Sequence, residues 1–268
     1  MAMLNGDGFS GMIGPFVIRK MKDGRSVIQI KPRHYRLNAK SKKTTTMWGF
    51  GSTVACLIRK QLSSAVMLYD PGMVNRFNDP IRDVLSHCYN SKENVFNFEQ
   101  DSFNRLTDFE FNIKSPLINF LWVKPVMLLK DNVLTVTIPE FQIGSQFTFP
   151  ARTNTCQVTI LVTQINLNQA LTREELESTF EINADELNHP ERTLTFNLAN
   201  ESISVAAIGL AFFKRTNDIR TPYNSKSFSP ANVIGAVVTG GVYVEPPAPL
   251  RSHVGYSKEW TFESKLKF

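Results

Sequence analysis

Apolar residues recur every three or four positions between residues 44 and 89, which is the spacing of one face of an α-helix. The first stretch begins at Thr44, where three successive threonines offer hydroxyls that can cap a helix. Its apolar face would consist of Met47, Phe50, Val54, Leu57, Ile58, Leu62, Ala65 and Val66. The second stretch contains two Asp-Pro pairs, at 70–71 and 79–80, each typical of a helix start. We predict one helix from Thr44, followed by two short helices or one kinked helix across residues 71–89.

From about residue 95 the pattern changes to the alternation of β-strands. Val126–Leu129 and Val133–Ile138 flank a Lys-Asp-Asn turn and predict a hairpin. Long β-branched or aromatic runs follow at 155–167, 193–198, 203–213 and 233–244. One exception is Thr172, because Thr-x-x-Glu fits a capping box and predicts a single helical turn. The pattern predicts an antiparallel β-sandwich of roughly seven to nine strands, as one sandwich or two.

The N-terminal residues form a glycine-rich arm and a basic β-hairpin. Four glycines lie within residues 6–14, and strands at 16–21 and 26–30 flank Asp23-Gly24, a strong hairpin turn signal. The hairpin ends at Lys31-Pro32-Arg33, because proline lacks the N–H that a strand ladder needs. Two strands alone are marginally stable, so we expect this hairpin to lie on its own molecule or on another copy.

The chain is therefore predicted to be mainly β, with a short helical insert and a distinct C-terminal tail. The predicted organisation is an arm and hairpin in 1–36, a helical segment in 37–94, a sandwich in 95–245, and a proline-rich spacer and tail in 246–268. Pro246-Pro247-Ala248-Pro249 would hold the chain extended. The tail residues Tyr256, Trp260 and Phe262 would then pair with a sheet edge of a second subunit, or fold back onto their own sandwich.

Charge is distributed unevenly along the chain. The net charge is +6, but residues 1–64 carry 12 lysines and arginines against two acids, whereas the remainder has a net charge of −4. This asymmetry predicts an anionic partner or an acidic face on a second copy. The candidate interface cations are Arg19, Lys20, Arg25, Lys31, Arg33 and Arg36.

Residue patterns typical of catalysis or metal binding are not found in the sequence. The four histidines are scattered, the three cysteines are widely spaced, and the nucleophile and phosphate-loop motifs are missing. We predict a protein that is not an enzyme and needs neither cofactor nor metal. The sequence contains no run of about 18 apolar residues, so we predict no transmembrane helix. The N-terminus lacks the features of a classical signal peptide, so we expect synthesis in the cytoplasm, with assembly outside the cell left open.

The opening of the chain resembles an uncharacterised family of Bacteroidota proteins of unknown function. The matching residues are Ser10-Gly11-Met12-Ile13-Gly14, then Lys31-Pro32-Arg33, and then the helix from Thr44. The resemblance covers about the first ninety residues, and an Asn-Pro-x-Thr stretch usual in that family is replaced here by Asn38-Ala39-Lys40. It implies no enzyme activity and no ligand, and it is compatible with a structural or appendage role.

Three functions remain open from the sequence. The leading one is a non-enzymatic structural subunit that self-associates into an oligomer, tube or filament, as in phage-like or extracellular assemblies. The second is a nucleic-acid-binding module, because the basic segment interleaves cations with Phe16 and Tyr35. The third is a carbohydrate- or surface-binding sandwich whose site lies on loops.

Overall fold

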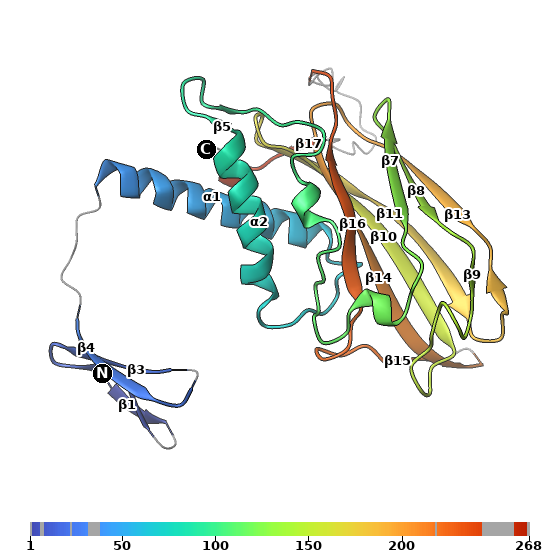
Figure 1. Ribbon diagram of the computed structural model, residues 1–268, viewed down its shortest axis with the longest axis horizontal. Helices are drawn as coiled ribbons and strands as arrows, with labels where there is room; N and C mark the ends of the chain where they lie inside the picture. Colours follow the sequence, from blue (N-terminus) through green and yellow to red (C-terminus); the bar gives the residue numbers. More distant parts are fainter. Residues whose placement is uncertain are drawn as a thin grey trace, which may run out of the picture. The chain divides into compact units, whose positions relative to one another are not determined.

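The computed structural model of the protein describes residues 2–5, 8–21, 23–31, 38–217, 219–242 and 260–266. Contacts divide the chain into two units, Met1–Thr45 and Thr46–Phe268. The protein is mainly β, with several antiparallel sheets and the helices α1 (Ala39–Gln61) and α2 (Met73–Cys88) (Figure 1). Within the described ranges, neither helix is long and apolar enough to cross a lipid bilayer.

The N-terminal unit contains a four-stranded antiparallel sheet in the order β1-β2-β3-β4. Its strands are β1 (Ala2–Asn5), β2 (Gly8–Ile13), β3 (Phe16–Lys20) and β4 (Ser26–Ile30). The predicted hairpin is β3 and β4, and Gly24 adopts the positive φ of +85° that its turn requires. The glycine-rich arm adds β1 and β2, which the residue pattern had not predicted, so the hairpin is half of a larger sheet.

The second unit is organised around a curled six-stranded antiparallel sheet (Figure 1). The strand order is β15-β14-β10-β11-β17, and β16 also pairs with β14. The strands are β10 (Thr155–Asn166), β11 (Leu171–Asn183), β14 (Ile203–Thr216), β15 (Ile219–Pro222), β16 (Ala231–Val238) and β17 (Trp260–Phe262). The runs predicted at 155–167 and 203–213 coincide closely with β10 and β14, whereas the run predicted at 233–244 overlaps β16, which ends earlier, at Val238.

Both faces of this sheet are buried. On β10, Val158 and Ile160 belong to a cluster shared with a three-stranded sheet, whereas Leu161 belongs to a cluster shared with the helices. The three-stranded sheet has the order β13-β8-β7 and consists of β7 (Val126–Lys130), β8 (Val133–Ile138) and β13 (Arg192–Asn197). Successive side chains of a strand point to opposite faces, so one strand can contribute to two cores.

Shorter elements connect these layers. Two pairs of two-residue strands are β5 (Tyr89–Asn90) with β6 (Val95–Phe96), and β9 (Phe141–Gln142) with β12 (Asn188–His189). Three 3₁₀ turns are η1 (Asn104–Leu106), η2 (Leu117–Asn119) and η3 (Ser264–Leu266).

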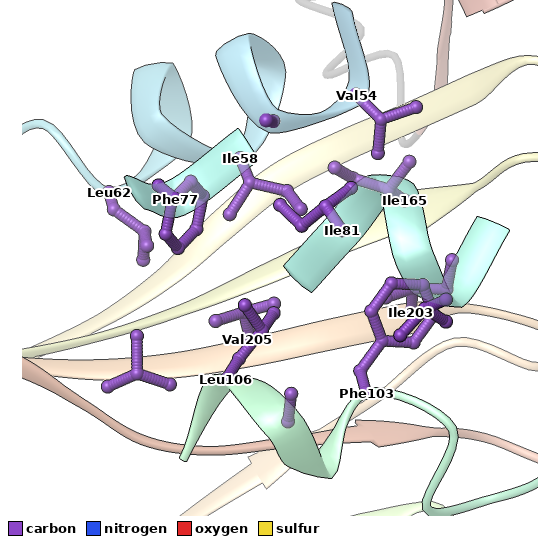
Figure 2. Packing of buried hydrophobic residues seen from close by; sticks show 14 of the residues in the cluster. Val54, Ile58, Leu62, Phe77, Ile81, Phe103, Leu106, Ile165, Ile203 and Val205 are labelled. Atoms are coloured by element: carbon purple, nitrogen blue, oxygen red, sulfur yellow. The ribbon is translucent and has the colours of Figure 1, made fainter. Parts of the chain in front are cut away.

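The helices cover one face of the six-stranded sheet. Figure 2 shows the buried side chains of α1 and α2 directed towards those of the sheet. Its labelled residues are Val54, Ile58, Leu62, Phe77, Ile81, Phe103, Leu106, Ile165, Ile203 and Val205. At Gly209 of β14 the loop after α1 comes so close that a Cβ atom would lie 1.9 Å from the carbonyl oxygen of Ala65. The loop and the strand are therefore in backbone contact here, which only glycine permits.

The first helix begins earlier than predicted. Its N-cap is Asn38, whose Oδ1 accepts a hydrogen bond of 2.7 Å from the N–H of Ser41. The three threonines predicted to cap the helix lie inside it, and Thr45 donates its hydroxyl proton to the carbonyl of Ser41. The predicted apolar face is present, except that Leu57 is only partly buried, while its neighbour Ile58 is fully buried.

The second helical stretch is one helix that contains Pro80, so the alternative of two separate helices is wrong. Asp79-Pro80 therefore does not start a helix. Phe77, Ile81 and Leu85 are fully buried on one face of α2. Burial of this face on both sides of Pro80 outweighs the loss of one backbone hydrogen bond.

The helical turn predicted at Thr172 is also wrong. Thr172 lies in β11, opposite Ile165 of β10, and its side chain is buried. The ladder between β10 and β11 extends over most of both strands. Pairing of this length with a buried strand outweighs a four-residue capping pattern, which acts only locally.

Candidate functional site

Four of the predicted interface cations lie on the N-terminal sheet. Arg19 and Lys20 end β3, Arg25 lies in the following turn, and Lys31 follows β4; all four are exposed. Arg25 pairs with Asp23 at 2.6 Å. The other three have no ion pair among the described residues. These cations can therefore contact an acidic surface without first breaking an ion pair described here.

The same sheet has an exposed apolar face. Register places Ile18 opposite Ile28, and Phe16 opposite both Ile13 and Ile30. Residues opposite each other project on one side of a sheet, so these five side chains form what we term the N-terminal apolar face. Ile28 is 65% exposed and Ile30 is 72% exposed. Such a face favours contact with another apolar surface.

The C-terminal tail pairs with its own chain. Trp260 and Phe262 are the ends of β17, which adds to the edge of β11 opposite Leu171–Arg173. Phe262 is 60% exposed, whereas Leu266 is fully buried in the core beneath the helices. The sequence singled out the two aromatic residues but missed Leu266, whose only signal was an apolar residue between two lysines. Three predicted interface residues lie outside the described ranges: Arg33, Arg36 and Tyr256.

An acidic strand edge lies next to the tail. Among the described residues, β17 pairs with β11 only as far as Arg173. Glu174, Glu175 and Glu177 follow on β11, and we term these three residues the acidic edge. Glu177 accepts a hydrogen bond of 3.1 Å from the hydroxyl of Ser64. A hollow of about 710 Å³ separates this part of β11 from β13. Within the described part of the chain, the second unit therefore presents negative charge along a strand edge that no other strand pairs with.

The buried histidine serves as a core side chain. The ring of His189 stacks between those of Phe141 and Phe180, with centroid distances of 5.1 and 5.3 Å. Neither ring nitrogen has a hydrogen-bond partner in the described part of the chain. Burial lowers the pKa of His189, Arg192 acts in the same direction, and the Glu186 carboxylate, 3.7 Å away, opposes both. This environment holds the imidazole neutral at pH 7.

One carboxyl group that the sequence analysis did not select is Glu110. It lies between Phe109 and Phe111, and burial raises its pKa to about 7. Both carboxylate oxygens lie 3.1 Å from the N–H of Leu117. The only sequence signal for Glu110 was its place between two aromatic residues. A polar residue that alternates with aromatic residues is also usual on the solvent-facing side of a strand, so the pattern did not indicate a buried carboxyl group.

Within the described ranges, no group of three or more histidine, cysteine or acidic side chains is arranged to hold a metal ion. Cys56, Cys88 and Cys156 are free thiols, and burial raises the pKa of Cys156. Comparison of the chain with protein-family models, with curated proteins and with solved structures finds no match.

Proposed function

We propose that this protein is a non-enzymatic structural subunit that self-associates through its N-terminal sheet into an oligomer, tube or filament. The observation that carries the proposal is the N-terminal apolar face. Monomeric proteins rarely leave a continuous apolar patch uncovered, and such patches commonly mark contact surfaces. Each large aliphatic side chain that becomes fully buried contributes about 1.5–3 kcal/mol before the cost of ordering is subtracted.

A second copy of the chain is the partner that the charges favour. Lys20 projects on the same side of the sheet as this face, Arg19 projects on the other side, and Lys31 follows β4. The acidic edge of the second unit offers the opposite charge. Each copy thus has a basic, apolar surface and an acidic one. Contact between the basic surface of one copy and the acidic edge of the next would be head-to-tail, which generates rings or filaments.

The body that carries the acidic edge is interpreted as an antiparallel β-sandwich. The six-stranded and three-stranded sheets share one buried cluster, and the helices form a further layer on the opposite face of the larger sheet. In this interpretation the body is a rigid block with its own core, and the N-terminal sheet serves as the connector between blocks.

The test replaces two residues of the apolar face, Ile28→Asp and Ile30→Asp, in the full-length chain. Light scattering after size-exclusion chromatography should report an oligomer for the wild type and a smaller species for the double variant. Circular dichroism should show that the body still unfolds at the wild-type temperature. Ser26→Asp, also exposed and on β4, adds one of these two negative charges without loss of an apolar side chain and serves as the control for charge.

A wild-type chain that remains strictly monomeric at tens of micromolar would refute self-association. An oligomer that survives the double variant would show that another surface holds the copies together. The charge component is tested separately by the double variant Arg19→Glu with Lys20→Glu, which should associate more weakly than the wild type. Mixing this variant with the double variant Glu174→Lys with Glu175→Lys should restore association between the two chains.

A nucleic-acid-binding module is the second candidate. It is favoured by the exposed cations Arg19, Lys20 and Lys31, which have no ion pair among the described residues and lie on or next to a sheet that also carries Phe16. Titration with a single-stranded oligonucleotide at several salt concentrations separates the two functions. Phosphate contacts predict an affinity that falls steeply with salt. A sub-micromolar affinity with such a salt dependence would replace self-association as the leading function.

A further inference from the structure

The second unit contains a pocket of about 360 Å³ that self-association does not use. One wall consists of the paired segment around Glu110 and β16, and the other of the loop from Leu117 to Pro125. Most of the lining is apolar, and its principal residues are Leu117, Ile118, Leu121, Val123 and Ile234. Apolar walls with a few convergent polar groups are typical of small-molecule sites.

Strand pairing brings the polar groups together. Glu110 and Asn232 face each other across an antiparallel bridge, and hydrogen bonds of 3.0 Å on either side join Phe111 N–H to Ala231 and Val233 N–H to Phe109. Directly opposed residues project to the same side, so both polar side chains enter the pocket while Phe111 enters the core. The backbone therefore holds the carboxyl and the amide in position.

The polar groups of the pocket are mainly acceptors. The Oδ1 atom of Asn232 is buried and has no hydrogen-bond partner among the described residues. Glu110 receives the Leu117 N–H, which leaves further lone pairs on its two oxygens. At the rim, Lys124 pairs with Asp108 at 2.8 Å, so that cation is already matched. A ligand that donates hydrogen bonds would satisfy the acceptors, whereas a carboxylate or phosphate would meet two acids.

The charged surroundings of Glu110 come from three elements. Asp108, on its own segment, raises the pKa of Glu110 in addition to burial. Arg76 of α2 lowers it and donates a hydrogen bond of 3.0 Å to the backbone carbonyl of Glu110. Hydrogen bonds from Leu117 and Asn232 lower it further, and Lys124 lines the loop side. Burial prevails, so about half of the molecules hold a neutral Glu110 at pH 7.

We propose that this pocket binds a small organic cation, with its primary ammonium group against Glu110 and Asn232 Oδ1 and its apolar body against Leu117, Ile118 and Leu121. An ammonium group supplies three donors and a positive charge, which matches an acidic site rich in acceptors. The apolar body displaces water from the aliphatic wall.

Binding should depend on pH because the cation requires an ionised Glu110. The ionised fraction of a carboxyl with a pKa of about 7 rises about tenfold from pH 6 to pH 8. An aliphatic amine remains protonated throughout this range. Affinity for the amine should therefore increase about tenfold between these two pH values.

The experiment titrates the full-length protein with n-butylamine hydrochloride at pH 6, 7 and 8, with calorimetry and protein-observed NMR as readouts. 1-Butanol and sodium butyrate are the neutral and anionic comparisons. We expect saturable binding of the amine alone, with the tenfold dependence on pH. Glu110→Gln keeps an oxygen for the Leu117 N–H and should abolish binding, whereas the exposed Glu191→Gln should not alter it.

Ile118→Trp provides an independent variant, because this residue is 47% exposed and an indole there would fill the pocket without loss of core packing. The Ile118→Trp variant should not bind n-butylamine, and it should still unfold cooperatively. Absence of saturable amine binding would overturn the proposal. Equal binding of 1-butanol, retention of binding in either variant, or an affinity independent of pH would overturn it as well.

Discussion

Two of the antiparallel sheets contain strands of similar apolar content but differ in how deeply those strands are buried. In β14 of the six-stranded sheet, the first eight residues are all buried. In β4 of the N-terminal sheet, only Gln29 is even partly buried, although three of the five residues are valine or isoleucine. A strand's apolar content therefore does not determine its burial, which requires a second layer. The larger sheet has a layer on each face, and the smaller sheet is proposed to obtain one from another copy.

The largest effect should come from the helix-side core of the larger sheet. Ile58→Ala removes a fully buried side chain and should lower the free energy of unfolding by about 2–5 kcal/mol. The matched substitution Ile28→Ala, at a position 65% exposed in the single copy, should change it by less than about 0.5 kcal/mol in samples dilute enough for the copies to dissociate. Urea unfolding of both variants measures the difference. Equal losses would show that the N-terminal sheet is packed as tightly as the core.

Glycine should be required in the two sheets for different reasons. Gly209→Ala would place a methyl group against the Ala65 carbonyl and should cost about 3 kcal/mol by forcing the backbones apart. Gly24→Ala meets no atom within 4 Å but strains a turn at positive φ. Its effect should be confined to the N-terminal sheet, with the thermal unfolding of the body unchanged. A tolerated Gly209→Ala would contradict the close approach of loop and strand.

The tail distinguishes packing within one copy from exchange between copies. Leu266→Ala should lower stability by about 2 kcal/mol, because it removes a buried side chain near a chain end that can partly relax. Phe262→Ala, at 60% exposure, should cost less than about 0.5 kcal/mol. Both variants are then examined by light scattering. If Leu266→Ala also dissociates the oligomer, the tail belongs to the neighbouring subunit; if only stability falls, it serves its own chain.

The smallest effect concerns pH. Because burial lowers the pKa of His189, the unfolded chain binds a proton more readily, and stability should fall as the pH drops below about 6.5. His189→Phe keeps the stacking between two phenylalanines and removes two unpaired ring nitrogens, so it should add about 1 kcal/mol at pH 7. Thermal unfolding from pH 5 to pH 8 should show a larger gain at the acidic end. A constant gain across this range would exclude His189 as the titrating group.

Much of the fold could be predicted from short-range patterns. The β3–β4 hairpin, the α1 apolar face and the strands β7, β8, β10 and β14 were predicted close to their observed bounds. The same reasoning placed the helix N-cap at Thr44 and a helical turn at Thr172, and both predictions were wrong. Capping and turn signals depend on a few neighbouring residues, so they are easily outweighed by pairing with a distant strand.

The candidate sites depended more on tertiary structure. The sequence identified Arg19, Lys20 and Lys31 through their density of charge, but it did not show that they belong to a sheet with an exposed apolar face. It also did not select Glu110, because the raised pKa arises from burial opposite Asn232, more than a hundred residues away. Long-range contacts of this kind leave no local pattern.

By itself the sequence determined the period of each segment, the hairpin turn at Asp23-Gly24 and the asymmetry of charge, because these follow from bonded geometry and residue type. Only the tertiary structure decided that α2 continues through Pro80, that Leu266 enters the core, and that the described part of β17 pairs with β11 only as far as Arg173. Those outcomes depend on which surfaces exclude water together. Which surfaces pack together depends on residues far apart in the sequence, and the free energy of their burial exceeds local secondary-structure propensities of about 1 kcal/mol per residue.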